Sequence, residues 1–166
     1  MILAIDPGTT ESGCVILDGK DIFECGVMDN HYVLDLINSI PVITDTDFNK
    51  IEICCEMVAS YGMAVGKTVF ETCVWIGRFE QASIECGFSF EKVYRGEVKD
   101  YLCKSRRAKD ANIRQAIIDM YEPTGGGKTP QIGTKKEPGP LYGVKSHVWA
   151  ALGVGLTYRN KLENQK

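Results

Sequence analysis

Short apolar runs separated by turn residues predict a β-sheet at the start of the chain. Three strands are expected, over residues 1–7, 11–19 and 21–29. The sequence Asp18-Gly19 between the last two is typical of a tight hairpin turn. The opening of the chain is therefore predicted to form an antiparallel meander.

Further along the chain, apolar positions three or four residues apart predict helices between additional strands. Asn30 can cap a helix over 31–40 that ends near Pro41, and Gly87 can terminate a helix over 67–86. The remaining predicted elements are strands over 50–57 and 88–94 and helices over 95–104, 109–121 and 143–161. This order predicts a single α/β domain over residues 1–166, with a mixed five-stranded sheet flanked by helices.

Two segments lack the periodicity of a helix or a strand. Residues 42–50 are expected to form a loop, and residues 122–142 are poor in apolar residues and rich in Gly, Pro and Lys. We expect the second segment to be an exposed, mobile, basic loop. Its sequence TGGGKT is similar to a phosphate-binding loop, but Glu122 stands where that motif requires Gly, so nucleotide binding there is not expected.

Composition adds two expectations about where the protein works. No apolar stretch reaches the roughly 20 residues of a membrane-spanning helix, and the N-terminus lacks the basic start of a signal peptide. The seven cysteines include no CxxC pair, and the adjacent Cys54 and Cys55 must point to opposite faces of a strand. We expect a cytoplasmic protein with no membrane partner and with buried, reduced thiols.

The charge is distributed unevenly along the chain, although the net charge is only −3. Residues 1–91 carry 15 Asp and Glu against 4 Lys and Arg, whereas residues 92–166 carry 7 against 15. Such a chain can contain both a metal-binding site and a surface for a polyanion. Folding could also intermix the two halves and average the asymmetry out.

Two acidic residues stand where predicted strands end. Asp6 follows the apolar run MILAI, and Glu56 follows the run IEICC. Carboxylates at the ends of neighbouring strands can meet and hold a divalent metal, which favours metal-assisted phosphodiester chemistry. Glu52 lies on the same face as Glu56 but about 13 Å away, too far to share one ion directly.

His147 stands near the start of the last predicted helix, where it could bring an imidazole to the same metal. A lone histidine is, however, more often an ordinary surface or core residue. Cations gather in the second half of the chain: Lys92, Arg95, Lys99, Lys104, Arg106, Arg107, Lys109, Lys128, Lys135, Lys136 and Lys145. Tyrosines lie among them, a combination suited to phosphate contacts and base stacking, although a solvated face is the alternative.

The opening strand with its acid, the second acid and the strand order resemble the RNase H-like fold. More closely, the chain resembles the RuvC family of Holliday junction resolvases, in the small bacteriophage-type branch. The stretches that carry the resemblance are AIDPGTTESG (4–13), ICCEMVASYGMAVGKTVFETCVWIGRF (53–79), VYRGEVK (93–99), AKDANIRQAIID (108–119) and PGPLYGVKSHVWAALGVGLTY (138–158). Together they cover about half of the chain.

The resemblance implies roles for individual residues. Asp6 and Glu56 match two metal-binding carboxylates, and Lys99 and Lys109 match basic positions that face the scissile DNA. The family pattern has two acidic positions three apart in the last helix, with histidine known at the first in some members. Here these positions are His147 and Ala150, so the second ion loses a ligand unless Asp110 or Glu52 replaces it.

The resemblance implies a homodimeric endonuclease that cleaves branched DNA, chiefly Holliday junctions, by symmetric nicks. Asp6, Glu56 and His147 would hold two Mg²⁺ or Mn²⁺ ions, with Lys99 and Lys109 also catalytic. Residues expected to bind DNA are Arg95, Lys104, Arg106, Arg107, Lys135, Lys136 and Lys145. The helix over 67–86, with Trp75 and Phe79, is the expected dimer face, although plain core packing explains it almost equally well.

Two other functions fit parts of the sequence. The absence of an acid at Ala150 favours a protein that binds DNA branches and cuts them poorly or not at all. The sequence DPGTT (6–10) is similar to the phosphate turn of actin-like ATPases, although those proteins need a second such domain.

Overall fold

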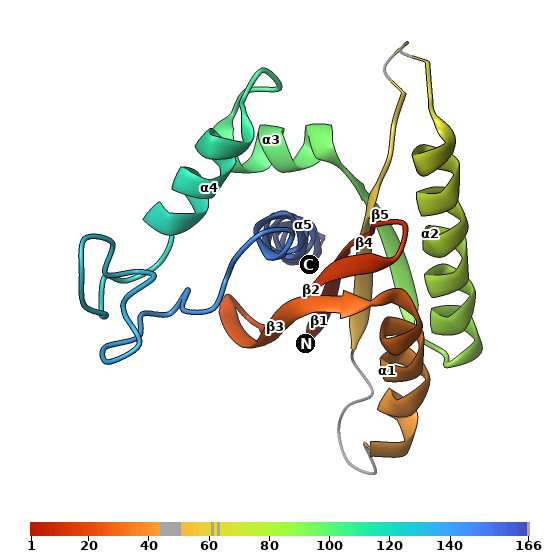
Figure 1. The fold of residues 1–166 in the computed structure, drawn as a ribbon, viewed down its shortest axis with the longest axis horizontal. Coiled ribbons are helices and arrows are strands. Elements are labelled where there is room, and N and C mark those ends of the chain that lie inside the picture. Colours follow the sequence, from red (N-terminus) through yellow and green to blue (C-terminus); the bar gives the residue numbers. More distant parts are fainter. Residues whose placement is uncertain (44–50, 61, 63, 166) are drawn as a thin grey trace.

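The computed structural model describes residues 1–43, 51–60, 62 and 64–165 (Figure 1). The described residues form five strands in one sheet, with the order β3-β2-β1-β4-β5. The strands are β1 (Ile2–Asp6), β2 (Glu11–Asp18), β3 (Asp21–Asp29), β4 (Glu52–Met57) and β5 (Ser89–Tyr94). β2 pairs antiparallel with β1 and β3, whereas β1, β4 and β5 run parallel, so the sheet is mixed as expected.

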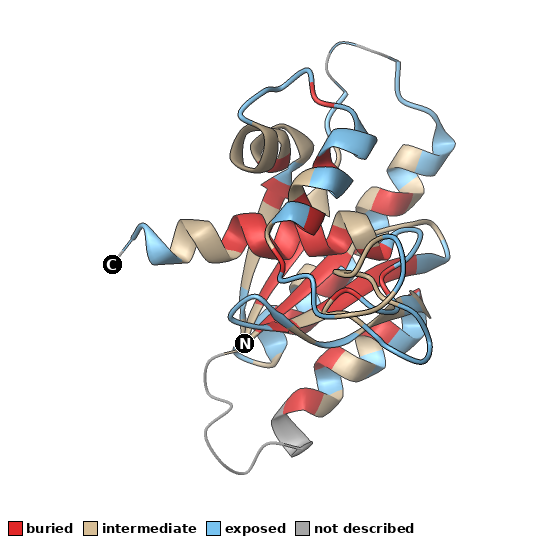
Figure 2. Ribbon diagram, turned by 90° about the vertical axis from the view of Figure 1, so that its left-hand side faces the viewer, coloured by how far each residue is buried: buried red, intermediate tan, exposed pale blue. Residues whose placement is uncertain are grey.

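Five helices, counted over the same residues, cover both faces of the sheet: α1 (Asn30–Ile43), α2 (Lys67–Glu85), α3 (Arg95–Cys103), α4 (Asp110–Asp119) and α5 (Val148–Glu163). Figure 1 shows α1 and α2 on one side of the sheet, and α5 between the other side and the pair α3 and α4. Buried residues concentrate in the central strands and in the middle of α5 (Figure 2).

The alternation of side chains divides the core into two clusters. Cys54 belongs to the cluster beneath α5, and its neighbour Cys55 belongs to the cluster beneath α1 and α2, which confirms that they point to opposite faces. All seven cysteines are free thiols, and burial raises the pKa of Cys14 to about 12. No helix of the described residues is both long and apolar enough to cross a membrane.

Most predicted helix ends are confirmed within two residues. α2 ends where Gly87 adopts a φ of 79°, and the amides of Gly87 and Phe88 donate to the carbonyls of Ile84 and Ser83. This is the paired hydrogen-bond pattern of a glycine-terminated helix. α1 continues past Pro41 to Ile43. Residues 44–50 of the predicted loop lie outside the described residues.

The predicted cap of α1 and the predicted start of the last helix are wrong. Asp29, not Asn30, caps α1, because Asp29 Oδ1 accepts the His31 amide at 2.8 Å while Asn30 is buried and bonded elsewhere. The last helix begins at Val148 rather than 143, because Gly143 and Ser146 have positive φ angles of 91° and 48°. Such angles do not continue a right-handed helix.

The segment 122–142 forms turns held by its own backbone. The amides of Gly125, Gly126 and Gly139 donate to carbonyls of Pro130, Glu137 and Ile132 at 2.8–3.1 Å. Lys135 and Lys136 are exposed at its surface, as predicted. Its mobility stays a prediction.

Candidate metal and DNA site

Asp6 and Glu56 are neighbours at the ends of two parallel strands. The last registered pair of β1 and β4 is Ile5 with Cys55, so the next residues along each strand lie side by side, about 4.8 Å apart along the sheet. Because side chains alternate, both acids share the face of Ala4 and Cys54, which lie beneath α5. The sheet thus brings together the two carboxylates that the sequence singled out.

A buried hydrogen-bonded turn fixes the backbone immediately after Asp6. The Asn30 side chain donates to the Gly8 carbonyl at 3.0 Å and accepts from Ser12 Oγ at 2.6 Å, and Ser12 Oγ accepts the Gly8 amide at 3.4 Å. The Asn30 amide donates to the Thr10 carbonyl at 2.9 Å. The turn amide of Gly8 therefore serves the fold, which argues against a phosphate-binding role for DPGTT.

His147 reaches Asp6 because Gly13 leaves room for its backbone. Gly13 pairs with Asp6 across β1 and β2, and a Cβ on it would lie 2.6 Å from the His147 carbonyl group. The positive φ of Ser146 then turns the chain into α5. His147 Nδ1 lies 3.0 Å from Asp6 Oδ2. If this nitrogen donates to the carboxylate, Nε2 keeps the lone pair that binds a metal.

Arg95 links the largely buried acid Glu56 to the exposed acid Asp110. Its Nη1 lies 3.4 Å from Glu56 Oε2, and its Nη2 lies 2.5 Å from Asp110 Oδ1. Arg95 follows β5, and β5 runs parallel to β4, so the residue emerges at the same sheet edge as Glu56. The sequence suggested only a DNA contact for Arg95; the parallel strand order is the signal that would have placed it here.

The electrostatics of the site favour a cation. Burial, opposed by Arg95 and reinforced by Asp6 and Asp110, raises the pKa of Glu56 to about 7. Burial, opposed by His147 and Arg95, also raises the pKa of Asp6. Two carboxylates and an imidazole are a donor set that fits Mg²⁺ or Mn²⁺, and a bound cation would compensate their buried charge. Among the described residues, no three His, Cys, Asp or Glu side chains are close enough together to hold a metal ion in this structure.

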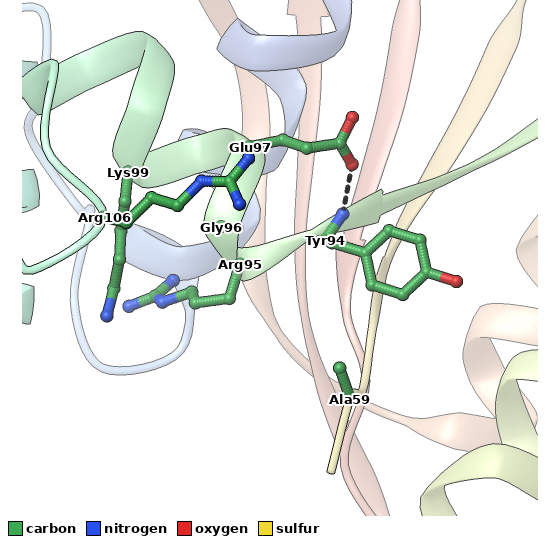
Figure 3. A pocket seen from close by; sticks show the side chains of 7 residues that line it. All are labelled: Ala59, Tyr94, Arg95, Gly96, Glu97, Lys99 and Arg106. Carbon is green, nitrogen blue, oxygen red and sulfur yellow. Dashed lines mark hydrogen bonds between the residues drawn. The ribbon is translucent and has the colours of Figure 1, made fainter. Parts of the chain in front are cut away.

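Lys99 and Arg106 line a pocket beside Arg95. The pocket, of about 630 Å³, also takes in Ala59, Tyr94, Gly96 and Glu97. Figure 3 shows the basic side chains together on one side of it, with the Tyr94 ring on the other. This places Lys99 next to the residue that contacts Glu56. Arg106 also pairs with Asp100, at 2.7 Å.

The other predicted basic residues lie on several different segments. Lys109 is exposed and precedes Asp110 at the start of α4, and Lys104 lies over the Tyr101 ring at 5.4 Å. Arg107 lines a separate pocket between α3 and α4. Lys145 is exposed two residues before His147, whereas Lys135 and Lys136 belong to the 122–142 loop. The DNA-binding roles of all these residues stay predictions.

A smaller cavity of about 230 Å³ lies between α4 and the start of α5. Asp110, His147 and Ala150 line it, together with Arg114 and Trp149. The Arg114 guanidinium lies 4.7 Å from the centre of the Trp149 ring. Sequence reasoning missed this stacked pair, because only the packing of α4 against α5 brings the two together.

Glu52 has a structural partner set at the opposite end of β4. Its Oε2 accepts hydrogen bonds from Ser89 Oγ and, at 2.9 Å, from Tyr158 Oη. These contacts join β4, β5 and α5. Glu52 is therefore neither simply solvated nor placed to replace the acid missing at Ala150.

The sheet order and its helices define the RNase H-like fold, which confirms the predicted fold class. Two solved structures of RuvC from Thermus thermophilus are similar to the chain. One is described as RuvC in complex with a Holliday junction substrate, and it matches with a TM-score of 0.67 and 16% identity over 99% of this chain and 95% of that one. The other, of Thermus thermophilus RuvC, matches with the same score and identity over 99% and 96%.

No protein-family model matches the sequence, and no curated protein sequence matches it either. At 16% identity the two structures establish the fold and leave the activity open. The chain has a RuvC-like RNase H fold over nearly its whole length.

Proposed function

We propose that this protein is a metal-dependent endonuclease of the RuvC type that cleaves branched DNA, chiefly Holliday junctions. The convergence of Asp6, Glu56 and His147 at one sheet edge carries the proposal. The likeness to RuvC, one structure of which holds a Holliday junction substrate, supports the choice of DNA. The sequence resemblance further suggests the bacteriophage-type branch and action in the cytoplasm, that of a host cell if a phage encodes the protein.

The residues of the site divide the work between binding and charge compensation. Asp6, Glu56 and His147 would hold divalent ions against the scissile phosphate, and the buried sheet edge keeps the two carboxylates in place. Bound there, Mg²⁺ or Mn²⁺, two ions per site, would supply an activated water and stabilise the leaving 3′ oxygen. Lys99 and Lys109 would compensate the charge that develops on the phosphate.

Symmetric nicks require two copies of this site facing one junction, so we propose a homodimer. We propose that α2 supplies the surface for it, but not through Phe79. Phe79 is fully buried in the core, and Trp75 packs against the same cluster. The exposed apolar side chains of α2 are Phe70, Val74 and Ile84, with 58–63% of their surfaces accessible. We propose that this face, and not Phe79, meets the second copy.

Cleavage of a labelled synthetic four-way junction tests the proposal. The junction and a linear duplex of the same sequence are incubated with Mg²⁺, Mn²⁺ or EDTA. Paired symmetric nicks in the junction alone, abolished by EDTA, are the expected result. Nicks in several branched substrates would indicate a broader debranching nuclease, and cutting of the linear duplex at the same rate would contradict the proposal.

Ala150 favours a second candidate, a protein that binds branched DNA without cutting it efficiently. Ala150 lines the cavity beside His147, and its methyl group cannot bind a metal ion there. This candidate predicts a gel shift with the junction and no product in either metal. An actin-like ATPase would instead show a thermal shift with ATP and Mg²⁺, which the internal bonding of Gly8 leads us not to expect.

A further inference from the structure

Asp6, Glu56 and His147 supply too few ligands for the ions that the proposed function needs. Magnesium prefers six ligands and usually takes carboxylate oxygens together with water and phosphate. Two ions that share three side chains would depend heavily on solvent and DNA. A further carboxylate near the three residues would therefore change how the protein binds metal before DNA arrives.

Asp110 is a carboxylate that lies beside His147 and could serve as this further ligand. It lines the same cavity as His147 and Ala150, although it belongs to α4 and they belong to the start of α5. Its charge reaches the two strand-end acids, since it contributes to the raised pKa of both Asp6 and Glu56. Glu52, the other acid considered for this role, is bonded to Ser89 and Tyr158 at the far end of β4.

A positive group already sits between Asp110 and Glu56. The two nitrogens of one guanidinium, that of Arg95, contact both carboxylates, at 3.4 Å and 2.5 Å. A single planar cation thus bridges the two acids. Asp110 has 84% of its side chain exposed, against 16% for Glu56, so it can turn toward an ion without disturbing the core.

We propose that Asp110 is a further metal ligand, which joins Asp6, Glu56 and His147 when Arg95 releases it. Arg95 is then the internal counter-ion of the metal-free protein. This inference rests on the proposed function for its metal site. It concerns metal binding by the free protein, so it can be tested without DNA.

Calorimetric titration of the DNA-free protein with Mn²⁺ tests the role of Asp110. Asp110→Asn should weaken binding by about tenfold or more, or remove one equivalent of metal, because an amide is a poor substitute for a carboxylate. Asp119→Asn is the matched control, since it makes the same charge change at the exposed far end of α4. It should leave the titration unchanged.

A rescue variant separates ligation from a general charge effect. Ala150 lines the same cavity as Asp110. It lies three residues after His147, so the two residues are neighbours on one side of the helix. Ala150→Asp in the Asp110→Asn background should restore the Mn²⁺ stoichiometry and most of the affinity. Unchanged Mn²⁺ binding in Asp110→Asn would overturn the proposal.

Arg95→Ala tests the counter-ion role. Removing the competing guanidinium should tighten Mn²⁺ binding by the free protein several-fold, whereas an equal or weaker affinity would refute this role. The outcomes also distinguish the two proposals. Junction cleavage by the wild type with wild-type Mn²⁺ binding in Asp110→Asn refutes the Asp110 assignment alone. If the wild type does not cleave the junction but Asp110→Asn still weakens Mn²⁺ binding, the nuclease is refuted and Asp110 remains a ligand.

Discussion

At the scale of single residues, Glu56 carries most of what distinguishes this site from an ordinary strand end. Its side chain is largely buried, and its nearest compensating charge is the guanidinium of Arg95. A structural carboxylate would normally be matched by fixed donors, as Glu52 is by Ser89 and Tyr158. Glu56 instead has a partner that it shares with an exposed acid, an arrangement suited to exchange for a metal ion.

Glu56→Gln should abolish cleavage and spare junction binding. The amide keeps the size and a hydrogen-bond acceptor for Arg95, but it loses the charge that binds a divalent ion. We expect a loss of about a thousandfold or more in cleavage rate, corresponding to about 4 kcal/mol. Cleavage assays beside gel shifts measure both. Loss of folding or of junction binding would show Glu56 to be structural.

Glu97 illustrates a different residue role, the attachment of α3 to its neighbours. It accepts the Tyr94 amide at 2.7 Å, drawn in Figure 3, and pairs with Lys161 of α5 at 2.7 Å. Burial alone would raise its pKa, but the bonds from Lys161 and Tyr94 outweigh burial and lower it. A carboxyl with a lowered pKa stabilises the fold above its ordinary pKa of 4.5, and this contribution disappears as the pH falls through the folded value.

Glu97→Gln should therefore destabilise the protein at neutral pH and not at low pH. Because over a third of the side chain is exposed, the expected loss at pH 7 is below about 1 kcal/mol. Urea melts at pH 7 and at several values below pH 4.5 measure the difference from wild type. Glu122→Gln, at an exposed carboxylate, is the control. A difference that persists unchanged in acid would contradict the ion-pair explanation.

At the scale of elements, periodicity located each strand and helix of the described residues, and it failed where tertiary contacts decide. The side-chain amide of Asn30 completes the turn at Gly8, a long-range contact that the sequence around Asn30 does not reveal. The sequence therefore predicts a cap that the structure does not have. The start of α5 was misplaced for a similar reason, since the angle at Ser146 follows from docking His147 on Gly13.

The candidate site was likewise predictable only in part. Strand ends identified Asp6 and Glu56 because a period of two and a parallel register fix where they emerge. The link from Arg95 to Asp110 was not predictable, since it depends on how α3 and α4 pack. The role of the two acids in metal binding stays a prediction.

Gly155 tests how closely α5 must approach the sheet. A Cβ there would lie 2.7 Å from Leu17 and 2.9 Å from the Ala4 side chain, so Gly155→Ala should overpack the core. The expected cost of about 1–3 kcal/mol exceeds the gain of about 1 kcal/mol from helix propensity. Thermal or urea unfolding measures the net loss. Gly77→Ala, in α2 with open space around it, should instead stabilise the protein. If both substitutions stabilise it, the core around Gly155 relaxes freely.

At the scale of the whole molecule, the acidic and the basic half of the sequence build largely different elements. The acidic half builds β1 to β4, the first half of β5 and the helices α1 and α2, whereas the basic half forms the rest of β5, the helices α3, α4 and α5, and the 122–142 loop (Figure 1). The strand-end acids lie where these halves meet, beside Arg95. A polyanion attracted to the basic side would therefore bring its phosphates toward the carboxylates, which alone would repel them.

The double variant Lys135→Ala and Lys136→Ala tests whether the 122–142 loop belongs to this surface. If each lysine contacts a phosphate, junction affinity should fall, and the slope of log affinity against log salt should shrink by about 2. The paired change Lys20→Ala and Lys67→Ala removes the same charge from the acidic half and should have little effect. Gel shifts or anisotropy at several salt concentrations measure both. An unchanged slope with unchanged affinity would exclude the loop from the interface, and junction binding would then rest on α3, α4 and the start of α5.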